Sequence, residues 1–320
     1  MTRVTGHASL QATLRQNVEF NGVGLHSGRA VRMLVRPAAA EFGIWFCRTD
    51  ISDRSNWISA KWNNVVESRL CTLLKNEDGV TVSTVEHIMA ALAGCGIHNA
   101  LIEIDGPEVP ILDGSSEPFA RKFLETGILE LDAPVRAVRV KKVVEVSDGK
   151  AFARLEPMDN LWIDFSIEFD DEAIGEQSKS LNLANGAFMH ELCDSRTFCR
   201  LADVDAMKSA GLALGGTFEN AVVVDGGSIL SPGGLRHKDE AVRHKMLDAL
   251  GDLMLAGAPL MARYTGHRAG HALTNKLLCK LMDDPSAYEM VICDEQATRR
   301  MPGVGVSLAD VPAPATSSVA

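Results

Sequence analysis

The sequence contains no uninterrupted apolar run long enough to cross a membrane. Its longest strongly apolar stretch, residues 253–262, is interrupted by Gly257 and Pro259, whereas a membrane-spanning helix needs about 20 apolar residues. Residues 1–7 also lack the apolar core of a signal peptide. We therefore predict a cytoplasmic protein without a transmembrane segment, and peripheral contact with a membrane surface is left open.

A surplus of positive charge is missing as well. The chain has 32 Lys and Arg against 42 Asp and Glu, which gives a formal net charge of -10. Broad nucleic-acid binding needs a surplus of cations facing the phosphates, so nucleic acid is excluded as a partner. A small anionic ligand stays possible, since it needs only a few local cations.

The seven cysteines form no Cys-x-x-Cys pair. They are odd in number and are spread from Cys47 to Cys293. This pattern is typical of reduced thiols in the cytosol and excludes a disulfide scaffold. We assign these cysteines no chemistry.

The composition that remains is that of a globular enzyme. The chain has 320 residues, of which 46% are hydrophobic and 23% are charged. Disordered and fibrous proteins differ strongly from these values, and the length exceeds that of a usual single domain. We therefore expect two domains, each with its own core.

Short strand-like runs separated by turns characterise the first 130 residues. They cover residues 30–36, 43–48 and 98–105, and the last run alternates apolar with polar residues. Two helices are expected among them. One follows Ser83-Thr84-Val85-Glu86, whose spacing is that of a capping box, and the other covers residues 117–125.

An aperiodic stretch at residues 129–134 marks the predicted domain boundary, after which strands resume. Strands are predicted over residues 138–144, 151–155, 161–169, 221–226 and 288–293, and helices over residues 203–210, 235–257 and 272–282. Both halves thus show strands followed by a polar-striped helix, which is a hint of internal duplication. We predict an α+β fold with domains at residues 1–130 and 136–300 and a flexible tail at residues 301–320.

The helix predicted over residues 235–257 carries a polar stripe. At about 100° per residue its apolar side chains share one face, whereas His244, Asp248 and Asp252 share the opposite face. Side chains four residues apart stack one turn apart, so His244 and Asp248 can bind one metal ion. Taken alone, the pair is also typical of a solvated polar face, and that alternative stays open. Arg243 falls within the apolar arc, so its stem either snorkels past the core or pairs with a buried carboxylate.

Glu86 and His87 lie in the first turn of their predicted helix. A catalytic zinc ion takes three protein ligands and a water, with a carboxylate nearby to accept the proton of that water. Glu86 is a candidate for that base, and a capping glutamate beside an incidental histidine is the alternative. The His-Glu-x-x-His motif of metallopeptidases is absent.

Gly266-His267-Arg268-Ala269-Gly270-His271 places two histidines four residues apart. The two glycines favour a loop that leads into a helix beginning near His271. A histidine at such a helix start is well placed as an acid or base, and a surface loop with two solvated histidines is the alternative.

The glycine-rich stretch 22–28 has the spacing Gly-x-Gly-x-x-x-Gly. This spacing differs from the dinucleotide-binding fingerprint, and no extended strand precedes it. We predict a turn there.

Together these motifs resemble the UDP-3-O-acyl-N-acetylglucosamine deacetylase family of lipid A biosynthesis. The resemblance extends from about residue 9 to about residue 295. It rests on residues 83–92, 242–252 and 270–276, with further similarity at residues 22–28, 109–115 and 195–198. Three long motifs in the same order are far more specific than any one of them.

The resemblance implies one zinc ion per chain, held by His87, His244 and Asp248. The site would lie at the interface of two similar layered sheet-and-helix domains. The resemblance also assigns roles to five further residues. Glu86 would be the general base, His271 the general acid and Asp252 the partner of His271. Lys245 and Thr197 would stabilise the oxyanion.

The resemblance also places a hydrophobic passage for the acyl chain in a small strand-helix-strand insert, at about residues 197–224. Its expected lining is Phe198, Leu201, Leu212 and Leu214. The family positions near UDP correspond to Lys150, Asp203 and Arg268. The sequence departs from the family pattern at Arg200, where an aromatic residue is expected, and at Arg268, where a lysine is expected.

The expected reaction is removal of the N-acetyl group from a UDP-linked, 3-O-acylated N-acetylglucosamine by a monomeric enzyme. One alternative is a zinc amidohydrolase that acts on another acylated amino sugar. A second is a non-catalytic protein that binds a nucleotide sugar. Glu86, His271 and Asp252 count against the second, because binding alone needs no acid and base.

Overall fold

The computed structural model describes residues 10–68 and 70–313. The first half is built on a five-stranded sheet with the strand order β2-β3-β9-β4-β5. Only the pair β4–β9 is parallel. Its elements are β2 (Val18–Val23), β3 (Ala30–Pro37), β4 (Ile44–Arg48), β5 (Trp57–Ser59), α1 (Glu86–Gly94), β9 (Ala100–Ile104) and α2 (Glu117–Thr126). In β3 the buried side chains alternate with more exposed ones, so one face of the sheet packs on the helices.

The second half repeats this arrangement. Its central strand β19 is antiparallel to β13 and parallel to β14, as β9 is to β3 and β4. The outer strands β12 and β15 complete the match to β2 and β5, and β11 and β20 extend the sheet to seven strands. The elements are β11 (Arg136–Val140), β12 (Val144–Asp148), β13 (Ala151–Pro157), β14 (Leu161–Glu168), β15 (Glu176–Asn182), α5 (Glu240–Met254), β19 (Leu260–His267), α6 (His271–Met282) and β20 (Tyr288–Ile292).

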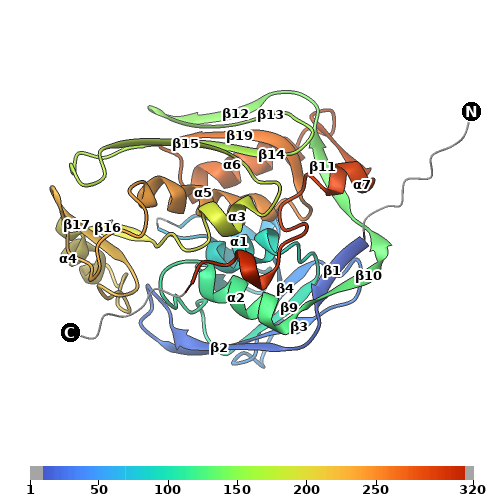
Figure 1. The fold of residues 1–320 in the computed structure, drawn as a ribbon. Coiled ribbons are helices and arrows are strands. Elements are labelled where there is room, and N and C mark those ends of the chain that lie inside the picture. Colours follow the sequence, from blue (N-terminus) through green and yellow to red (C-terminus); the bar gives the residue numbers. More distant parts are fainter. Residues whose placement is uncertain (1–9, 69, 314–320) are drawn as a thin grey trace, which may run out of the picture.

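The two halves face each other through their helices. Figure 1 shows the two sheets as outer layers with α1, α2, α5 and α6 between them. This confirms the predicted α+β fold of two similar sheet-and-helix units, and the shared topology gives the hint of duplication a structural basis.

The predicted strand-helix-strand insert is present. Strand β16 (Phe198–Arg200) leads into α4 (Leu201–Ser209) and pairs in parallel with β17 (Val222–Asp225). In Figure 1 the insert projects from one end of the layered body. The remaining elements are β1 (Leu10–Leu14), η1 (Trp62–Asn64), β6 (Val65–Val66), β7 (Leu73–Lys75), β8 (Thr81–Ser83), β10 (Ile128–Pro134), α3 (Ala187–Glu191), β18 (Ser228–Ile229), α7 (Glu295–Thr298) and η2 (Leu308–Asp310).

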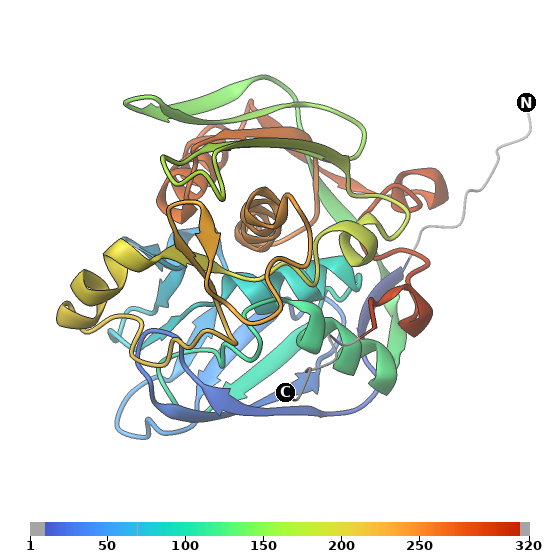
Figure 2. The ribbon, with the colours of Figure 1, turned by 60° about the vertical axis from the view of Figure 1, so that its left-hand side comes forward.

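Helices α1 and α5 approach each other closely at the centre of the molecule, where Figure 2 shows α5 almost end-on beside α1. A Cβ atom on Gly251 would lie 2.0 Å from the backbone oxygen of Glu86. Only glycine therefore lets the two backbones pack at this distance. The contact brings the first turn of α1 against the middle of α5.

Several local predictions differ from the structure. The strand predicted over residues 138–144 is divided between β11 and β12. The capping box at Ser83 is wrong, because its hydroxyl donates to Pro107 O and the Glu86 carboxylate accepts from Thr72 N. The long helix begins at Glu240 instead of residue 235. The aperiodic stretch before the second half is the strand β10, which pairs with β1.

The end of the chain packs against the layered body as far as it is described. Met301 and Val311 are buried, η2 lies within this part, and Arg121 Nη2 donates to Pro312 O. Residues 301–313 thus differ from the loose tail expected, and residues 314–320 lie outside the described residues. Within residues 10–68 and 70–313, no helix has both the length and the apolar character that membrane crossing requires.

Arg243 pairs with carboxylates, which is one of the two arrangements that its position in the helix allows. Its guanidinium pairs with Asp239 at 2.6 Å and with Glu191 at 2.8 Å. The arginine therefore ties α5 to α3, with its charge paired as its half-buried position requires.

Candidate active site

His87, His244 and Asp248 come together between the two halves. His87 is in the first turn of α1, and His244 and Asp248 lie one turn apart on α5. One ligand atom from each residue can be chosen so that all three lie within 4.8 Å of one another, and all three residues are buried. Two imidazoles and one carboxylate form a donor set that suits a zinc ion.

The polar atoms of this group fit a metal ion. Asp248 Oδ2 accepts from Lys245 Nζ at 2.7 Å, whereas Asp248 Oδ1 is buried and, among the described residues, has no hydrogen-bond partner. A buried carboxylate oxygen without a partner costs free energy unless a cation binds it. The residues present therefore fit the implied metal.

The protonation states also suit metal binding. Burial raises the pKa of Asp248, but His244 and Lys245 outweigh it and hold this pKa well below its usual range. Burial lowers the pKa of His244 to about 4. The aspartate is thus charged and the histidine neutral at neutral pH, as ligands must be.

The tautomer of His244 is set by the backbone. Its Nδ1 lies 3.0 Å from Ser195 O. A carbonyl oxygen only accepts, so Nδ1 carries the proton and Nε2 keeps its lone pair. His244 Nε2 faces Asp248 Oδ1 at 3.3 Å, which directs the lone pair toward the ligand set.

Glu86 lies beside the ligand set without belonging to it. Its Oε2 accepts from Thr72 N at 3.0 Å, and its Oε1 lies 3.8 Å from His271 Nε2. Burial raises the pKa of Glu86. A carboxylate with a raised pKa in this position can exchange a proton with a water molecule between it and the ligands.

His271 begins α6, as the sequence predicts. Its Nδ1 is 2.8 Å from Asp252 Oδ2, and Asp252 Oδ1 accepts from Thr72 Oγ1 at 2.5 Å. Burial lowers the pKa of His271, but the Asp252 and Glu86 carboxylates outweigh it and raise this pKa to about 9. His271 therefore carries a proton at neutral pH.

A cavity of about 740 Å³ opens from these groups toward the insert. Residues from α1, α5, the start of α6 and the insert share its wall. Its lining includes Glu86, His87, Thr197, Phe198, Leu201, Asp203, His244, Lys245, Asp248 and His271. Its size suits one small organic ligand together with part of an extended chain.

Some predicted substrate-binding residues lie outside this wall. Among the described residues that line the cavity, Leu212, Leu214, Lys150 and Arg268 are not found. Lys150 is exposed in the turn between β12 and β13. Arg268 pairs with Glu168 at 2.8 Å on the surface, immediately before the start of α6.

Arg200 occupies the position where an aromatic residue is expected. Its guanidinium pairs with Asp171, and it also lies 3.9 Å from Asp203. Its charge is thus engaged by two carboxylates at the cavity edge.

Three residues at the site escaped prediction from the sequence. His26 lines the cavity, and its Nε2 is buried without a partner among the described residues. Glu108 holds the loop of His26 by accepting from His26 N at 2.8 Å and Ser27 N at 2.7 Å. Thr72 links Glu86 to Asp252.

A signal for the His26 loop was present in the glycine-rich stretch 22–28. A Cβ on Gly24 would lie 2.3 Å from Glu108 Oε2, so this glycine permits the close approach of the carboxylate. The predicted turn is present at residues 25–27, but strand β2 runs to Val23, so the expectation that no extended strand precedes the stretch is wrong. Only the fold shows that the turn faces the cavity.

The chain matches the family described as UDP-3-O-acyl N-acetylglycosamine deacetylase over residues 11–283. It is 47% identical over 280 residues to the UDP-3-O-acyl-N-acetylglucosamine deacetylase of Phenylobacterium zucineum (strain HLK1), covering 88% of this chain and 96% of that one. It is 43% and 44% identical over 288 residues to the enzymes of that name from Histophilus somni (strain 129Pt) and Pasteurella multocida (strain Pm70). In both cases 89% of this chain and 94% of the relative are covered.

Proposed function

The chain belongs to the UDP-3-O-acyl N-acetylglycosamine deacetylase family, and from this premise we propose how its own residues carry out the reaction. The enzyme hydrolyses the N-acetyl group of UDP-3-O-acyl-N-acetylglucosamine in lipid A biosynthesis. The products are acetate and the free amine of the glucosamine unit. The observation that carries the proposal is the convergence of a metal-ligand set, a carboxylate and a protonated imidazole on one cavity.

Zinc is the metal we propose for His87, His244 and Asp248, one ion per chain. When bound, zinc supplies Lewis-acid chemistry, which makes water acidic and polarises a carbonyl group. The chain supplies two neutral imidazoles and one carboxylate, and it holds them on two helices that pack closely at Gly251. A bound zinc ion would take these three residues as its protein ligands.

Glu86 is the proposed general base. Its carboxylate reaches the space between the ligand set and His271, where the attacking water must lie. The base takes a proton from this water as its oxygen attacks the acetyl carbonyl carbon. Because burial raises the pKa of Glu86, the carboxylate is a stronger base than an exposed one.

His271 is the proposed general acid. Amide nitrogen is a poor leaving group until it is protonated, and His271 Nε2 carries the proton that it needs. Asp252 accepts from His271 Nδ1 at 2.8 Å, which fixes the ring so that Nε2 faces the cavity. The C–N bond then breaks, with the nitrogen leaving as an amine.

Lys245 and Thr197 are proposed to stabilise the negative oxygen that forms on the acetyl carbon. Both line the cavity on the side of the ligand set. Burial lowers the pKa of Lys245, but Asp248 outweighs it and raises this pKa, so the ammonium keeps its charge. A fixed positive charge and a hydroxyl can then stabilise the oxyanion without reorganising.

The insert is proposed to hold the acyl chain. Phe198 and Leu201 line the cavity, and Leu212 and Leu214 lie on the loop that follows α4. Asp203 lines the same wall, and Lys150 and Arg268 are proposed to approach the nucleotide from the surface. Since Arg200 pairs with Asp171, we expect the uracil contacts to differ from those of relatives with an aromatic residue there.

Acetate release from the UDP-linked sugar tests the function directly. Substrates with and without the 3-O-acyl chain are compared under the same conditions. Release that requires the acyl chain is the expected result. Equal release from both would favour a less specific amidohydrolase, and no release would contradict the proposed reaction.

Several sequence predictions remain proposals. They are the domains at residues 1–130 and 136–300, a monomeric state, a cytoplasmic location and one zinc ion per chain. The mass of the protein in solution checks the monomeric state, cell fractionation checks the location, and metal analysis checks the zinc content. Limited proteolysis near residues 129–134 checks the domain boundary.

A further inference from the structure

A single peptide group outside the cavity is held at both of its polar atoms by helix α5. Its carbonyl oxygen, Ser195 O, lies 3.0 Å from His244 Nδ1. Its amide, Arg196 N, donates to Glu240 Oε1 at 3.0 Å. Glu240 and His244 are one turn apart on α5, so the peptide group spans the two side chains along the helix.

The geometry of a peptide bond couples these two contacts. The group is planar and trans, so its N–H and C=O point in opposite directions. When Glu240 fixes the N–H of Arg196, the carbonyl of Ser195 must point away from Glu240, toward the ring of His244. The carboxylate can therefore act on a ring that it does not touch.

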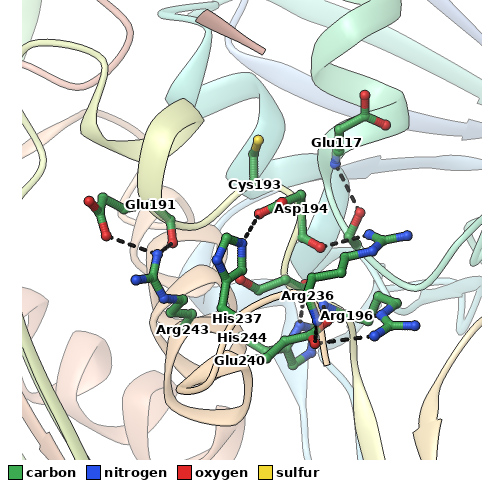
Figure 3. A network of polar contacts seen from close by, with 12 residues as sticks. Glu117, Glu191, Cys193, Asp194, Arg196, Arg236, His237, Glu240, Arg243 and His244 are labelled. Carbon is green, nitrogen blue, oxygen red and sulfur yellow. Dashed lines mark hydrogen bonds and ion pairs between the residues drawn. The ribbon is translucent and has the colours of Figure 1, made fainter. Parts of the chain in front are cut away.

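Glu240 is itself held firmly. It is 1% exposed. Its carboxylate accepts from Arg196 Nε at 2.9 Å and from Arg236 N at 2.7 Å. Arg196 Nη2 also donates to Gly234 O at 2.7 Å. Figure 3 shows Glu240 meeting Arg196 beside His244, with Arg236 and Asp194 completing the network.

The preceding residue, Asp194, is fixed by Arg236 and His237, and Arg236 also pairs with Asp113 of the first half. Arg236 Nη1 donates to Asp194 O at 2.7 Å and pairs with Asp113 Oδ2 at 2.9 Å. His237 Nε2 lies 2.8 Å from Asp194 Oδ1. The backbone therefore reaches Ser195 from a rigid anchor, and the Glu240 contact fixes the next peptide group.

We propose that Glu240 is a positioning residue for the metal site, which directs the Ser195 carbonyl onto His244 and so holds this ring as its Nδ1–H tautomer. With the proton kept on Nδ1, Nε2 offers its lone pair to the metal. Partners of this kind change the affinity of a metal site by about tenfold to a hundredfold. In this role the ion pair with Arg196 holds Oε1 of Glu240 beside the backbone amide of Arg196.

The residue that follows, Thr197, is also fixed at both of its backbone polar atoms. Thr197 N donates to Gly114 O at 2.8 Å, and Thr197 O accepts from Val222 N at 2.8 Å. Ser195 thus supplies the carbonyl that orients His244, and Thr197 supplies a side chain of the cavity wall. The peptide groups between them are fixed by hydrogen bonds. A shift at Glu240 would displace both.

Two conservative variants separate positioning from simple stabilisation. Glu240→Gln keeps the reach of the side chain and one acceptor oxygen for Arg196 N, but it loses the charge. Glu240→Asp keeps the charge but withdraws it by one methylene group. We expect both variants to lower stability, because each weakens a buried ion pair.

Zinc affinity should separate the two variants. The probe is zinc itself, titrated into the full chain against a competing chelator. Glu240→Asp should weaken zinc binding about tenfold or more, whereas Glu240→Gln should stay near the wild-type affinity. A purely structural ion pair would predict the reverse order or an equal loss.

Asp239→Asn is the matched control. It removes one negative charge from the adjacent residue, which pairs with Arg243 and Lys179. It should leave zinc affinity unchanged. Wild-type zinc binding by Glu240→Asp, or a loss in Glu240→Gln as large as in Glu240→Asp, would overturn the proposal.

The inference rests on the metal ligands of the proposed function, but its test needs no substrate. A wild-type chain that binds zinc without releasing acetate would contradict the deacetylation while leaving the role of Glu240 intact. A spectroscopic check is the His244 Nδ1–H signal in the zinc-loaded chain. It should exchange faster with water in Glu240→Asp than in Glu240→Gln, and equal exchange would count against the proposal.

Discussion

Glu86 and His271 bring a carboxylate and an imidazole to 3.8 Å from each other within a buried space. Neither is placed by its sequence neighbours alone. Thr72 contacts Glu86 through its backbone amide and Asp252 through its hydroxyl. The proposed base and the partner of the proposed acid are therefore held by one residue from the loop before β7.

Replacing Glu86 by glutamine should remove the base and keep the metal. An amide cannot take a proton from water, so we expect turnover to fall by about 100-fold to 10,000-fold. Zinc affinity should stay close to the wild-type value, because Glu86 is outside the ligand set. Acetate release and chelator competition measure the two effects. The exposed Glu77→Gln variant is the control, and wild-type turnover in Glu86→Gln would exclude the proposed role.

His98 lies outside the cavity wall and makes the stability of the fold depend on pH. Its Nδ1 accepts from Ala12 N at 3.0 Å, and burial lowers its pKa to about 4. An unfolded histidine takes up its proton near a pKa of about 6.5. The buried neutral histidine therefore costs no stability above about pH 6.5. As the pH falls from about 6.5 to about 4, the unfolded chain takes up a proton that the folded chain does not, and the free energy of unfolding decreases.

His98→Asn should reduce this acid sensitivity, because the amide oxygen can replace Nδ1 as acceptor and does not titrate. Between about pH 6.5 and pH 4 the variant should lose about 2 to 3 kcal/mol less than the wild type. Urea unfolding at a series of pH values gives the comparison. A slope in His98→Asn parallel to that of the wild type would show that His98 does not titrate in this way.

Among single residues, the sequence predicts those that a helical spacing brings together. His244 and Asp248 could be paired because one helix carries both, and the resemblance supplied His87. Thr72 and His26 could not be found, because their contacts with Asp252 and the cavity depend on segments far apart in the chain. No local pattern encodes such a contact.

Among the elements, α1 and α5 determine where the ligands meet. Their backbones pack at Gly251, where any side chain would overlap Glu86 O. The first turn of α1 carries both Glu86 and His87. A small change in the distance between these two helices would therefore move the proposed base and one proposed ligand together, relative to the other two proposed ligands.

Gly251→Ala should push the helices apart. A Cβ at 2.0 Å from a backbone oxygen cannot be accommodated without a backbone shift, and overpacking of this kind costs about 1 to 3 kcal/mol. We expect lower stability and weaker zinc binding in the same variant. Chemical unfolding and zinc titration measure both.

Gly227→Ala is the control for this substitution. The nearest neighbour of its added Cβ would be Glu172 Oε2 at 3.5 Å, an ordinary contact. Wild-type stability in Gly251→Ala would mean that α1 and α5 can separate without cost.

The elements also show where pattern reading succeeds. The amphipathic period of α5 and the alternation in β14 predict both elements, because each buries one face against a neighbour. The capping box fails because the helix begins at Glu86 with Val85 as its N-cap, so Glu86 is the first helical residue and cannot reach back to a cap at Ser83. Strand β10 lacks a periodic pattern, and its pairing with β1 arises from a partner more than a hundred residues away.

At the scale of the whole molecule, the metal would join the two repeated halves. His87 belongs to the first half, and His244 and Asp248 belong to the second. A metal bound to all three should therefore stabilise the folded arrangement of both. By mass action, free zinc at a hundred times its dissociation constant should add about 2.7 kcal/mol to the free energy of unfolding.

His87→Ala should lose most of this gain, because only the two ligands on α5 remain. Thermal or urea unfolding with zinc and with chelator gives the difference for each protein. The chelator-treated variant corrects for any effect of the substitution itself. Equal zinc stabilisation of the variant and the wild type would place the metal elsewhere.

The order of the predicted elements gave only a hint of the repeat, and the fold shows it in full. No shared residues align the halves, yet the strand orders β2-β3-β9-β4-β5 and β12-β13-β19-β14-β15 match in order and direction. Topology persists because sheets and helices tolerate many apolar sequences, provided that the pattern of burial is kept. The resemblance predicted two similar units, whereas composition and length predicted only their number.

The division of the ligands between the halves has a consequence during protein synthesis. The first half emerges from the ribosome with His87 alone, and one imidazole cannot hold a metal ion against competing ligands in the cell. His244 and Asp248 follow only when most of the chain has been made. The complete set of proposed ligands therefore exists only after Asp248 has been synthesised, so a product that ends before His244 would carry one of the three.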